Sequence, residues 1–471
     1  MSRVSVYLMI MAISLQLKAS GSVESSSADR QDVEVTVYNS NVGLIKEKRE
    51  VSIPSGEGEL KFMDVASQIN PVSVHVKSLS DQGKFTVLEQ NYEYDLMSHE
   101  KLLEKYVGKK IKIVDWNEYK DRKETVEAQL LSADGGEIYK IGDEIFLGHP
   151  GYKVLPEVPS NLISRPTLSW NYRNKAKRKQ QIEVSYLTSG ISWSADYVLL
   201  VPSSGENGEI SGWVTVDNQS GALYENAQLK LVAGDLNRVN NELPAKKLRM
   251  GQMTDSRMPG QEFSREKLFE YHIYDLQRKT TLKNNQTKQI KLLEAGGVKL
   301  SKEYVTAAPQ NRYWGRRIDG QLKQPVQVNL TFSNDKQNSL GTPIPAGTVR
   351  IYTIDSKGKQ QFIGEDRVDH TPENEKITLK TGNAFDIVAE RVQTDFTQKT
   401  SQLYETDWTI TIRNRKDEKI TVGVLEKAHG NWEVVESSHK YRKVDASSFR
   451  FDVTVPENGE TKIGYKLRVG I

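Results

Sequence analysis

The chain is dominated by short stretches in which apolar and polar residues alternate. The clearest stretch runs from Tyr186 to Val201 and holds two such segments, one on either side of Gly190. A period of two places every second side chain on the same face, so each segment predicts a half-buried β-strand. The second segment ends at Pro202, which cannot donate a hydrogen bond to a neighbouring strand. We interpret the stretch as two strands joined at a corner, with Trp193 as a buried core residue.

The same alternation organises the N-terminal third of the chain. Residues 22–92 hold several short alternating segments separated by turn residues, and predict a small N-terminal β unit. In residues 93–160 we expect one helix, from Ser98 to Val107, because Ser98 is a favourable N-cap residue and Gly108 stands where helices commonly end. The short strands that follow this helix, separated by glycine-containing turns, predict a small β-barrel.

The rest of the chain predicts two β-sandwich domains. Several prolines between residues 150 and 166 mark a domain boundary. We assign residues 161–322 to a β-sandwich with a mobile loop at 236–262, where the alternation is lost. Residues 323–471 form a second, C-terminal β-sandwich in this interpretation, because each strand has one apolar and one polar face.

Three of the predicted strands end at an asparagine, namely at Asn218, Asn334 and Asn414. We interpret this as a sign of related sandwich units, although the spacings between the three differ. The pattern as a whole predicts an all-β protein: tandem antiparallel β-sandwich domains with a small N-terminal β unit and an inserted small β-barrel.

The first residues predict export. Arg3 is followed by an apolar run that ends at Leu17 and then by small residues, which is the order of a secretory signal peptide. We therefore assign residues 1–21 to a signal peptide and expect the protein in the periplasm or at the cell surface. Since no second apolar run is long enough to cross a bilayer, we expect no transmembrane segment in the mature chain.

Composition narrows the choice of partners. The 471 residues include 65 basic and 62 acidic side chains, a formal net charge of +3, and this balance argues against a nucleic-acid partner. The absence of cysteine excludes disulfide bonds and thiol catalysis.

No catalytic motif is recognisable. The sequence has no His-Glu-x-x-His, no glycine-rich phosphate loop and no Gly-x-Ser-x-Gly elbow. Its seven histidines are scattered without a His-x-His pair, so we expect neither a metal site nor a cofactor. Neighbouring carboxylates are too common to select a glycosidase site, which needs two of them across a sugar-binding cleft. We therefore identify no catalytic residues.

Two basic stretches are candidate binding sites. The first is the tip of a predicted hairpin and suits a polyanion such as lipopolysaccharide or an acidic glycan; it comprises Lys175, Lys177, Arg178 and Lys179. The alternative is a solvated turn without a function. The second combines arginines with aromatic rings that can stack on a sugar; it comprises Arg312, Tyr313, Trp314, Arg316 and Arg317. Its alternative is an aromatic side chain packed between domains, with the arginines reaching solvent.

Four landmarks of the sequence resemble those of a bacterial family named for its domain of unknown function, number 4139. They are residues 185–197 (Ser-Tyr-Leu-Thr-Ser-Gly-Ile-Ser-Trp-Ser-Ala-Asp-Tyr), 231–235 (Leu-Val-Ala-Gly-Asp), 341–350 (Gly-Thr-Pro-Ile-Pro-Ala-Gly-Thr-Val-Arg) and 383–386 (Asn-Ala-Phe-Asp). Some relatives are described as mucoidy-inhibitor-like, and some carry a central coiled coil that this sequence lacks. The resemblance implies an exported, β-rich protein without an established activity, and supplies no catalytic residues.

The sequence therefore favours a non-enzymatic envelope protein that binds an envelope protein or a glycan. The alternative is a hydrolase that acts on envelope polysaccharide with carboxylates from its loops. The sequence leaves the oligomeric state open.

Overall fold

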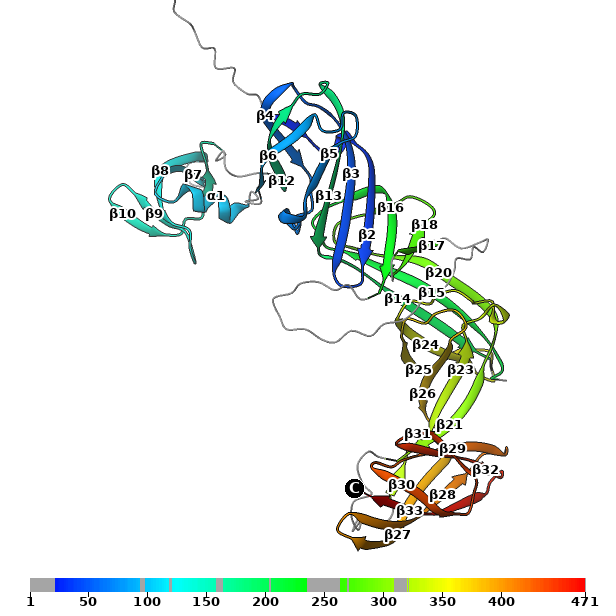
Figure 1. The fold of residues 1–471 in the computed structure, drawn as a ribbon. Helices are drawn as coiled ribbons and strands as arrows, with labels where there is room; N and C mark the ends of the chain where they lie inside the picture. The colour runs from blue at the N-terminus through cyan, green and yellow to red at the C-terminus, as the bar shows by residue number, and fades with distance from the viewer. Residues whose placement is uncertain are drawn as a thin grey trace, which may run out of the picture. The chain divides into compact units, whose positions relative to one another are not determined.

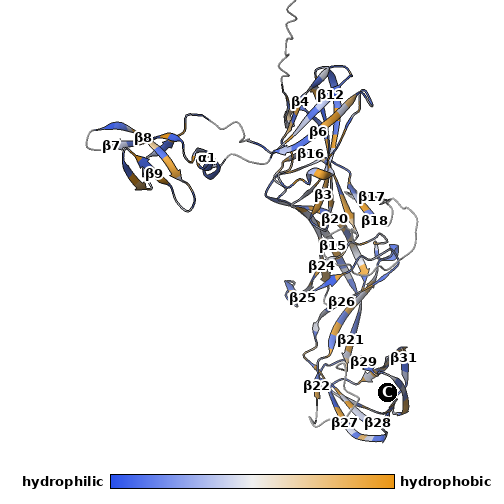
Figure 2. Cartoon of the chain, turned by 60° about the vertical axis from the view of Figure 1, so that its left-hand side comes forward, coloured by the Kyte–Doolittle hydropathy of each residue, from blue (hydrophilic) through white to orange (hydrophobic). Residues whose placement is uncertain are grey.

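The structure, a computed structural model, is nearly all β. It describes residues 22–93, 98–117, 121–157, 164–202, 205–234, 263–268, 271–308, 320 and 322–470. Of these residues 67% are in strands and 4% in helices, which confirms the predicted all-β class. The predicted signal peptide and the predicted mobile loop at 236–262 lie outside the described residues. Figure 1 shows the course of the chain, and Figure 2 shows that single strands carry both hydrophobic and hydrophilic residues.

Contacts within the chain divide it into two units. The first comprises residues 1–192, 217–230 and 278–286, and the second comprises residues 193–216, 231–277 and 287–471. Each unit is therefore assembled from segments that are distant in sequence.

The first unit contains two sheets and a small domain. One sheet has the order β1 (Val23–Ser25), β4 (Gly56–Met63), β12 (Thr167–Asn174) and β6 (Phe85–Glu93). The other includes β16 (Tyr224–Ala233), β2 (Arg30–Tyr38), β3 (Val42–Ser52), β13 (Lys179–Ser189) and β5 (His75–Ser78) in that order, and β19 (Thr280–Leu282) also pairs with β16. Two single-turn 3-10 helices, η1 (Ser27–Asp29) and η2 (Pro71–Ser73), lie between strands.

The small domain consists of helix α1 (His99–Tyr106) and one five-stranded antiparallel sheet. Its strand order is β10 (Glu144–Leu147), β9 (Ile138–Ile141), β8 (Arg122–Ser132), β7 (Lys110–Asn117) and β11 (Tyr152–Val154). The predicted helix is confirmed, since the Ser98 hydroxyl accepts a hydrogen bond from the Lys101 N–H at 3.1 Å and Gly108 has a φ of +83°. A core of its own holds the domain together; its buried residues are Leu103, Tyr106, Ile111, Ile113, Ala128, Leu130 and Tyr139.

The second unit contains three sheets. The first has the order β20 (Gln286–Lys299), β15 (Asn207–Asn218), β14 (Ile191–Val201), β24 (Gly347–Ile354) and β25 (Gln360–Val368). The second has the order β26 (Lys376–Asn383), β23 (Gln327–Ser333), β21 (Ser301–Ala307), β29 (Ile420–Lys427), β32 (Ser448–Val455) and β31 (Tyr441–Asp445). The third has the order β22 (Leu322–Gln324), β27 (Ile387–Thr400), β28 (Leu403–Asn414), β33 (Glu460–Gly470) and β30 (Asn431–Ser437).

Three further elements complete this unit: the paired strands β17 (Phe263–Leu268) and β18 (Tyr271–Leu276), and the 3-10 helix η3 (Lys336–Asn338). Apolar side chains from the last two sheets form one continuous core that includes Trp408, Phe449, Phe451 and Tyr465. Two sheets that share a core in this way bury the apolar face of each strand.

The corner predicted around Gly190 separates strands that enter different sheets. β13 ends at Ser189 and pairs with β3, whereas β14 begins at Ile191 and runs parallel to β24. Gly190 has a φ of +74°, and a Cβ atom there would lie 2.8 Å from the Gln219 carbonyl oxygen, so the corner requires glycine. Trp193 is 5% exposed and its indole N–H donates to the Val232 carbonyl at 3.1 Å. The prediction that Trp193 is a core residue is confirmed.

Among the described residues, four buried asparagines end strands in the same way. Asn174, Asn218 and Asn414 are the last residues of β12, β15 and β28, and Asn334 directly follows β23. All four are at most 1% exposed. Each side-chain amide donates to at least two backbone carbonyls, and each amide oxygen accepts a backbone N–H. Such an amide provides hydrogen-bond partners for buried backbone groups that are not paired within a sheet.

The four asparagines also share a second element, a turn that leads into another strand. In each case one of the carbonyls that accepts from the asparagine amide belongs to the residue two positions before a residue with positive φ. The carbonyl residue and the positive-φ residue are Pro54 and Gly56, Lys283 and Asn285, Pro372 and Asn374, and Pro456 and Asn458. Strands β4, β20, β26 and β33 begin at or within two residues of these positions. Asparagine and glycine are the residues that adopt this backbone conformation most readily. The motif suggested by three asparagines in the sequence thus occurs four times in the part of the chain that the structure describes.

Candidate functional site

The predicted basic tip, residues 175–179, connects β12 to β13 and is firmly anchored. The buried Asn174 side chain donates to the carbonyls of Ile53 and Pro54 at 3.0 and 3.1 Å. The Lys175 N–H donates to the Lys84 carbonyl at 2.8 Å, and the Arg178 carbonyl accepts from the Ile53 N–H at 2.6 Å. These bonds hold the backbone of the tip in one conformation and leave its four cationic side chains exposed.

Acidic residues partly neutralise the tip. The Lys179 ammonium lies 2.8 Å from Glu50, and both side chains are exposed, so this pair contributes little to stability. The hydrogen bond from Lys84, together with the Lys177 N–H, holds the pKa of Asp81 below its usual value. Within the described part of the chain, the side chains of Lys175, Lys177 and Arg178 form no ion pair. They are the cations of the tip that are available to a partner.

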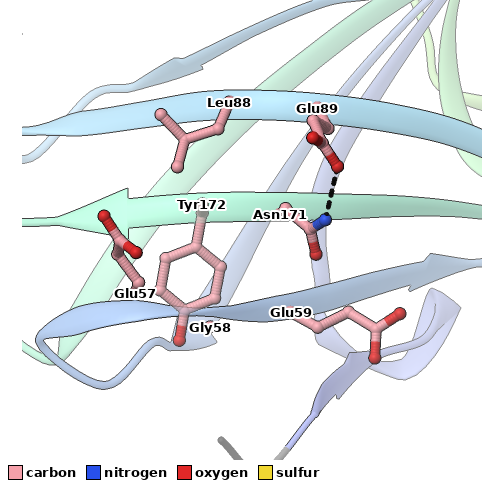
Figure 3. A pocket seen from close by; sticks show the side chains of 7 residues that line it. All are labelled: Glu57, Gly58, Glu59, Leu88, Glu89, Asn171 and Tyr172. Carbon is pink, nitrogen blue, oxygen red and sulfur yellow. Dashed lines mark hydrogen bonds between the residues drawn. The ribbon is translucent and has the colours of Figure 1, made fainter.

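A groove of about 450 Å³ lies on the four-stranded sheet that contains β12 (Figure 3). Its lining comes from β4, β6 and β12 and consists of Glu57, Gly58, Glu59, Leu88, Glu89, Asn171 and Tyr172. In Figure 3 the ring of Tyr172 extends across β4 beside Gly58, which pairs with it in the sheet. The groove therefore combines the exposed Leu88 with three carboxylates, whereas Tyr172 is only 1% exposed.

Each carboxylate of the groove already accepts a hydrogen bond from β12. Arg173 donates to Glu57 at 2.8 Å, the Ser169 hydroxyl donates to Glu59 at 2.7 Å, and the Asn171 amide donates to Glu89 at 2.8 Å. General acid catalysis by one of these groups would require it to carry a proton and to face the substrate. The observed bonds instead hold all three as acceptors within the sheet.

The second predicted binding stretch cannot be placed. Arg312, Tyr313, Trp314, Arg316 and Arg317 lie outside the described residues.

Two buried ionic clusters support the fold. In the first unit Glu47 is bound by Arg30 at 3.1 Å and by Arg49 at 2.8 Å, and the Arg49 guanidinium lies 3.5 Å from the centre of the Phe62 ring. In the second unit Arg391 pairs with Glu426, which also accepts a hydrogen bond from Tyr465 at 2.8 Å. Since both carboxylates are fully buried beside guanidinium groups, we regard these clusters as structural.

Other classes of site were sought in the described part of the chain. No group of three or more histidine or acidic side chains there is arranged to hold a metal ion. None of the described helices has the length and apolar character needed to cross a membrane.

The structure also reveals exposed apolar residues that the sequence interpretation did not single out. Among the described residues, nine of nineteen exposed large hydrophobic side chains fall between residues 107 and 154, in the small domain. Leu147 and Tyr152 are the most exposed of these, at 84% and 82%. A signal was available: β10 has the sequence Glu-Ile-Phe-Leu, and three successive apolar residues in a strand cannot all face one core.

No protein-family model matches this chain, and no curated protein sequence is significantly similar to it. The functional argument therefore depends on the residues themselves.

Proposed function

We propose that this protein is exported and acts in the cell envelope as a non-enzymatic binding protein, with an envelope protein or a glycan as its partner. The single observation that carries the proposal is the basic tip: a backbone fixed by Asn174 presents Lys175, Lys177 and Arg178 to solvent. Binding residues commonly lie on loops held by rigid sheets. A set of cations held in this way suits an anionic partner.

The proposal includes a modular architecture. The sheets belong to tandem β-sandwich units, and the small domain is a small β-barrel, left open between its edge strands β10 and β11, that is inserted between strands of the first unit. The repeated asparagine motif supports related units, because the same amide bonds and the same type of turn recur at Asn174, Asn218, Asn334 and Asn414. The resemblance to the domain-of-unknown-function family 4139 is part of this proposal.

A variant of the tip tests the binding function. The variant carries Lys175→Gln, Lys177→Gln, Arg178→Gln and Lys179→Gln, and the probe is a lipid-free acidic polysaccharide. We expect weaker binding and a smaller effect of salt on it, with a nearly unchanged melting temperature, because these side chains are exposed. A matched control removes four exposed charges elsewhere through Lys357→Gln, Lys359→Gln, Lys376→Gln and Lys380→Gln. Equal binding by both variants would remove the tip from the proposal.

The groove keeps a hydrolase as the second candidate function, since Glu57, Glu59 and Glu89 all line it. The measurement is sugar release from envelope polysaccharide by the parent and by Glu57→Gln, Glu59→Gln and Glu89→Gln. We expect no release by any of them. Release that stops in one of these variants would make the protein an enzyme.

A further inference from the structure

The five-stranded sheet of the small domain has one face that no described element covers. The opposite face packs on the domain core through Ile111, Ile113 and Tyr139. Side chains alternate between the two faces of a strand, so the cross-strand partners assign each residue to one face. We call the uncovered side the outward face. Its large exposed apolar residues are Trp116, Ile145, Leu147, Tyr152 and Val154, with exposures of 58%, 65%, 84%, 82% and 44%.

These five residues lie on the two edge strands of the sheet, β10 and β11, and on β7, which lies beside β11. Tyr152 on β11 pairs with Val114 on β7, and Trp116 is two residues further along β7 on the same face. Ile145 and Leu147 belong to β10, the opposite edge strand, and only residues 148–151 separate β10 from β11 in sequence. Five of the nine exposed apolar side chains of the small domain therefore lie on the outward face near its two edges, and the other four are Val107, Val126, Leu131 and Phe146.

Lysines share the outward face. Lys110 and Lys112 alternate with the core isoleucines of β7, Lys123 pairs with Trp116, and Lys140 pairs with Ile145. One acidic residue, Glu127, lies on this face among the lysines, and its carboxylate is 4.0 Å from the Lys110 ammonium. Among the described residues of the sheet, four cations against one anion make the face complementary to a negatively charged partner.

We infer that the outward face is a docking surface for a lipid bilayer with anionic headgroups. Apolar side chains of this size gain free energy when they enter the boundary between headgroups and acyl chains, and lysines beside them attract anionic lipids. Tryptophan and tyrosine are the residues that favour this boundary. The small domain thereby attaches the protein to a membrane surface without crossing it. This inference is independent of the basic tip and of its partner.

The composition of the face favours lipid over other partners. Lysine is depleted at the buried centres of protein interfaces, whereas here four lysines are interleaved with the apolar residues. A glycan is recognised through aromatic rings and hydrogen-bonding groups, and Ile145, Leu147 and Val154 supply neither. Lipid uses both kinds of side chain on this face, the aliphatic groups for insertion and the lysines for the headgroups.

The test is co-sedimentation of the full chain with two kinds of vesicle. One kind contains equal parts of phosphatidylethanolamine and phosphatidylglycerol, and the other contains phosphatidylcholine alone. We expect binding to the anionic vesicles and much weaker binding to the neutral ones. A variant with Ile145→Ser, Leu147→Ser and Tyr152→Ser is expected to bind the anionic vesicles roughly tenfold or more weakly, because it loses the inserted groups.

Two further variants separate the contributions. Lys112→Gln, Lys123→Gln and Lys140→Gln together are expected to weaken binding roughly a hundredfold at low salt and to reduce its salt dependence. The matched apolar control carries Val72→Ser and Phe385→Ser, which lie elsewhere and are 92% and 95% exposed, and is expected to bind like the parent. Far-ultraviolet circular dichroism and melting temperature establish that each variant is folded.

Three results would overturn the inference. The first is a parent chain that binds neither kind of vesicle. The second is an unchanged affinity of the folded Ile145, Leu147 and Tyr152 variant for anionic vesicles. The third is a parent chain that binds dextran sulfate but not vesicles, which would assign the face to an anionic glycan.

Discussion

The small domain and the C-terminal pair of sheets use apolar side chains in opposite ways. In the C-terminal sheets the large aromatic residues Trp408, Phe449 and Tyr465 are buried in a shared core. In the small domain, Trp116 and Tyr152 are exposed, at 58% and 82%. Both regions consist of strands with alternating side chains, and apart from the parallel pair β21 and β29 in the C-terminal region the strands are antiparallel, so secondary structure does not explain the contrast.

The difference separates scaffold from contact surface. The C-terminal region even encloses an ion pair, Arg391 with Glu426, inside its core. The small domain instead places its lysines and its apolar residues on the same outward face, where they cost stability unless a partner covers them. We therefore expect substitutions in the core of the C-terminal sheets to affect folding, and substitutions on the outward face of the small domain to affect binding.

The largest effect is expected from Arg391→Met in the C-terminal core. The substitution leaves the fully buried Glu426 without its guanidinium partner, which costs about 3–5 kcal/mol of unfolding free energy. Denaturant unfolding followed by tryptophan fluorescence measures this. A loss below about 1 kcal/mol would mean that the buried pair does not support this core.

A somewhat smaller effect is expected from Leu130→Ala in the core of the small domain. Leu130 is fully buried, and removal of such a side chain costs about 2–5 kcal/mol. Because this core contains few residues, the domain should become sensitive to protease while the C-terminal sheets stay resistant. Limited proteolysis with mass spectrometry of the fragments distinguishes the two regions. Simultaneous cleavage throughout the chain would contradict the independence of this core.

Asn414→Ala tests the strand-ending motif. Its amide donates to the carbonyls of Glu418 and Pro456 at 2.8 and 2.9 Å, and its oxygen accepts from the Lys416 N–H at 3.0 Å. Loss of these bonds leaves buried backbone groups unpaired, so we expect a decrease of about 1–3 kcal/mol in unfolding free energy. Thermal or denaturant unfolding measures it, with the exposed Asn431→Ala as the control. A cost no greater than that of the control would reduce the motif to a coincidence of sequence.

The smallest of these effects concerns the pH dependence of the small domain. Partial burial raises the pKa of Glu137, but hydrogen bonds from Lys153 at 2.8 Å and from Tyr139 at 2.9 Å outweigh it and lower the pKa below its ordinary 4.5. A carboxyl with a lowered pKa stabilises the folded state above its ordinary pKa, and this contribution disappears as the pH falls through the lowered value.

We therefore expect the small domain to lose up to about 1 kcal/mol of stability on acidification below pH 4.5, and the Glu137→Gln variant to lose less. The melting temperature of both proteins as a function of pH measures the difference. Parallel pH profiles for the two would show that Glu137 does not contribute.

The sequence predicted the individual helices and strands better than it predicted which strands lie beside each other. The helix from Ser98 and the strands on either side of Gly190 follow from caps, turns and alternation, which act between near neighbours. The parallel pairing of β14 with β24, which places Ala195 beside Gly347, depends on a choice among many similar strands. Alternation specifies two faces for a strand but not which other strand lies beside it.

The outward face shows the same limit for the site. In β7 the apolar residues Ile111 and Ile113 face the core, but Val114 and Trp116 continue the series on the other face. The sequence shows that the apolar residues of β7 change from one face of the strand to the other. Only the structure shows which face packs on the core, and hence that Trp116 is exposed. The basic tip was predictable because its charges are consecutive, while its anchor, the buried Asn174, required the structure.

Hydrogen exchange measured by mass spectrometry on the full chain, with and without anionic vesicles, tests the central claim that the outward face of the small domain is the contact surface. We expect exchange to slow in peptides that cover residues 110–116 and 144–154, and to remain unchanged in the C-terminal sheets. Unchanged exchange in those two segments, or slowing confined to the basic tip at residues 175–179, would contradict the claim.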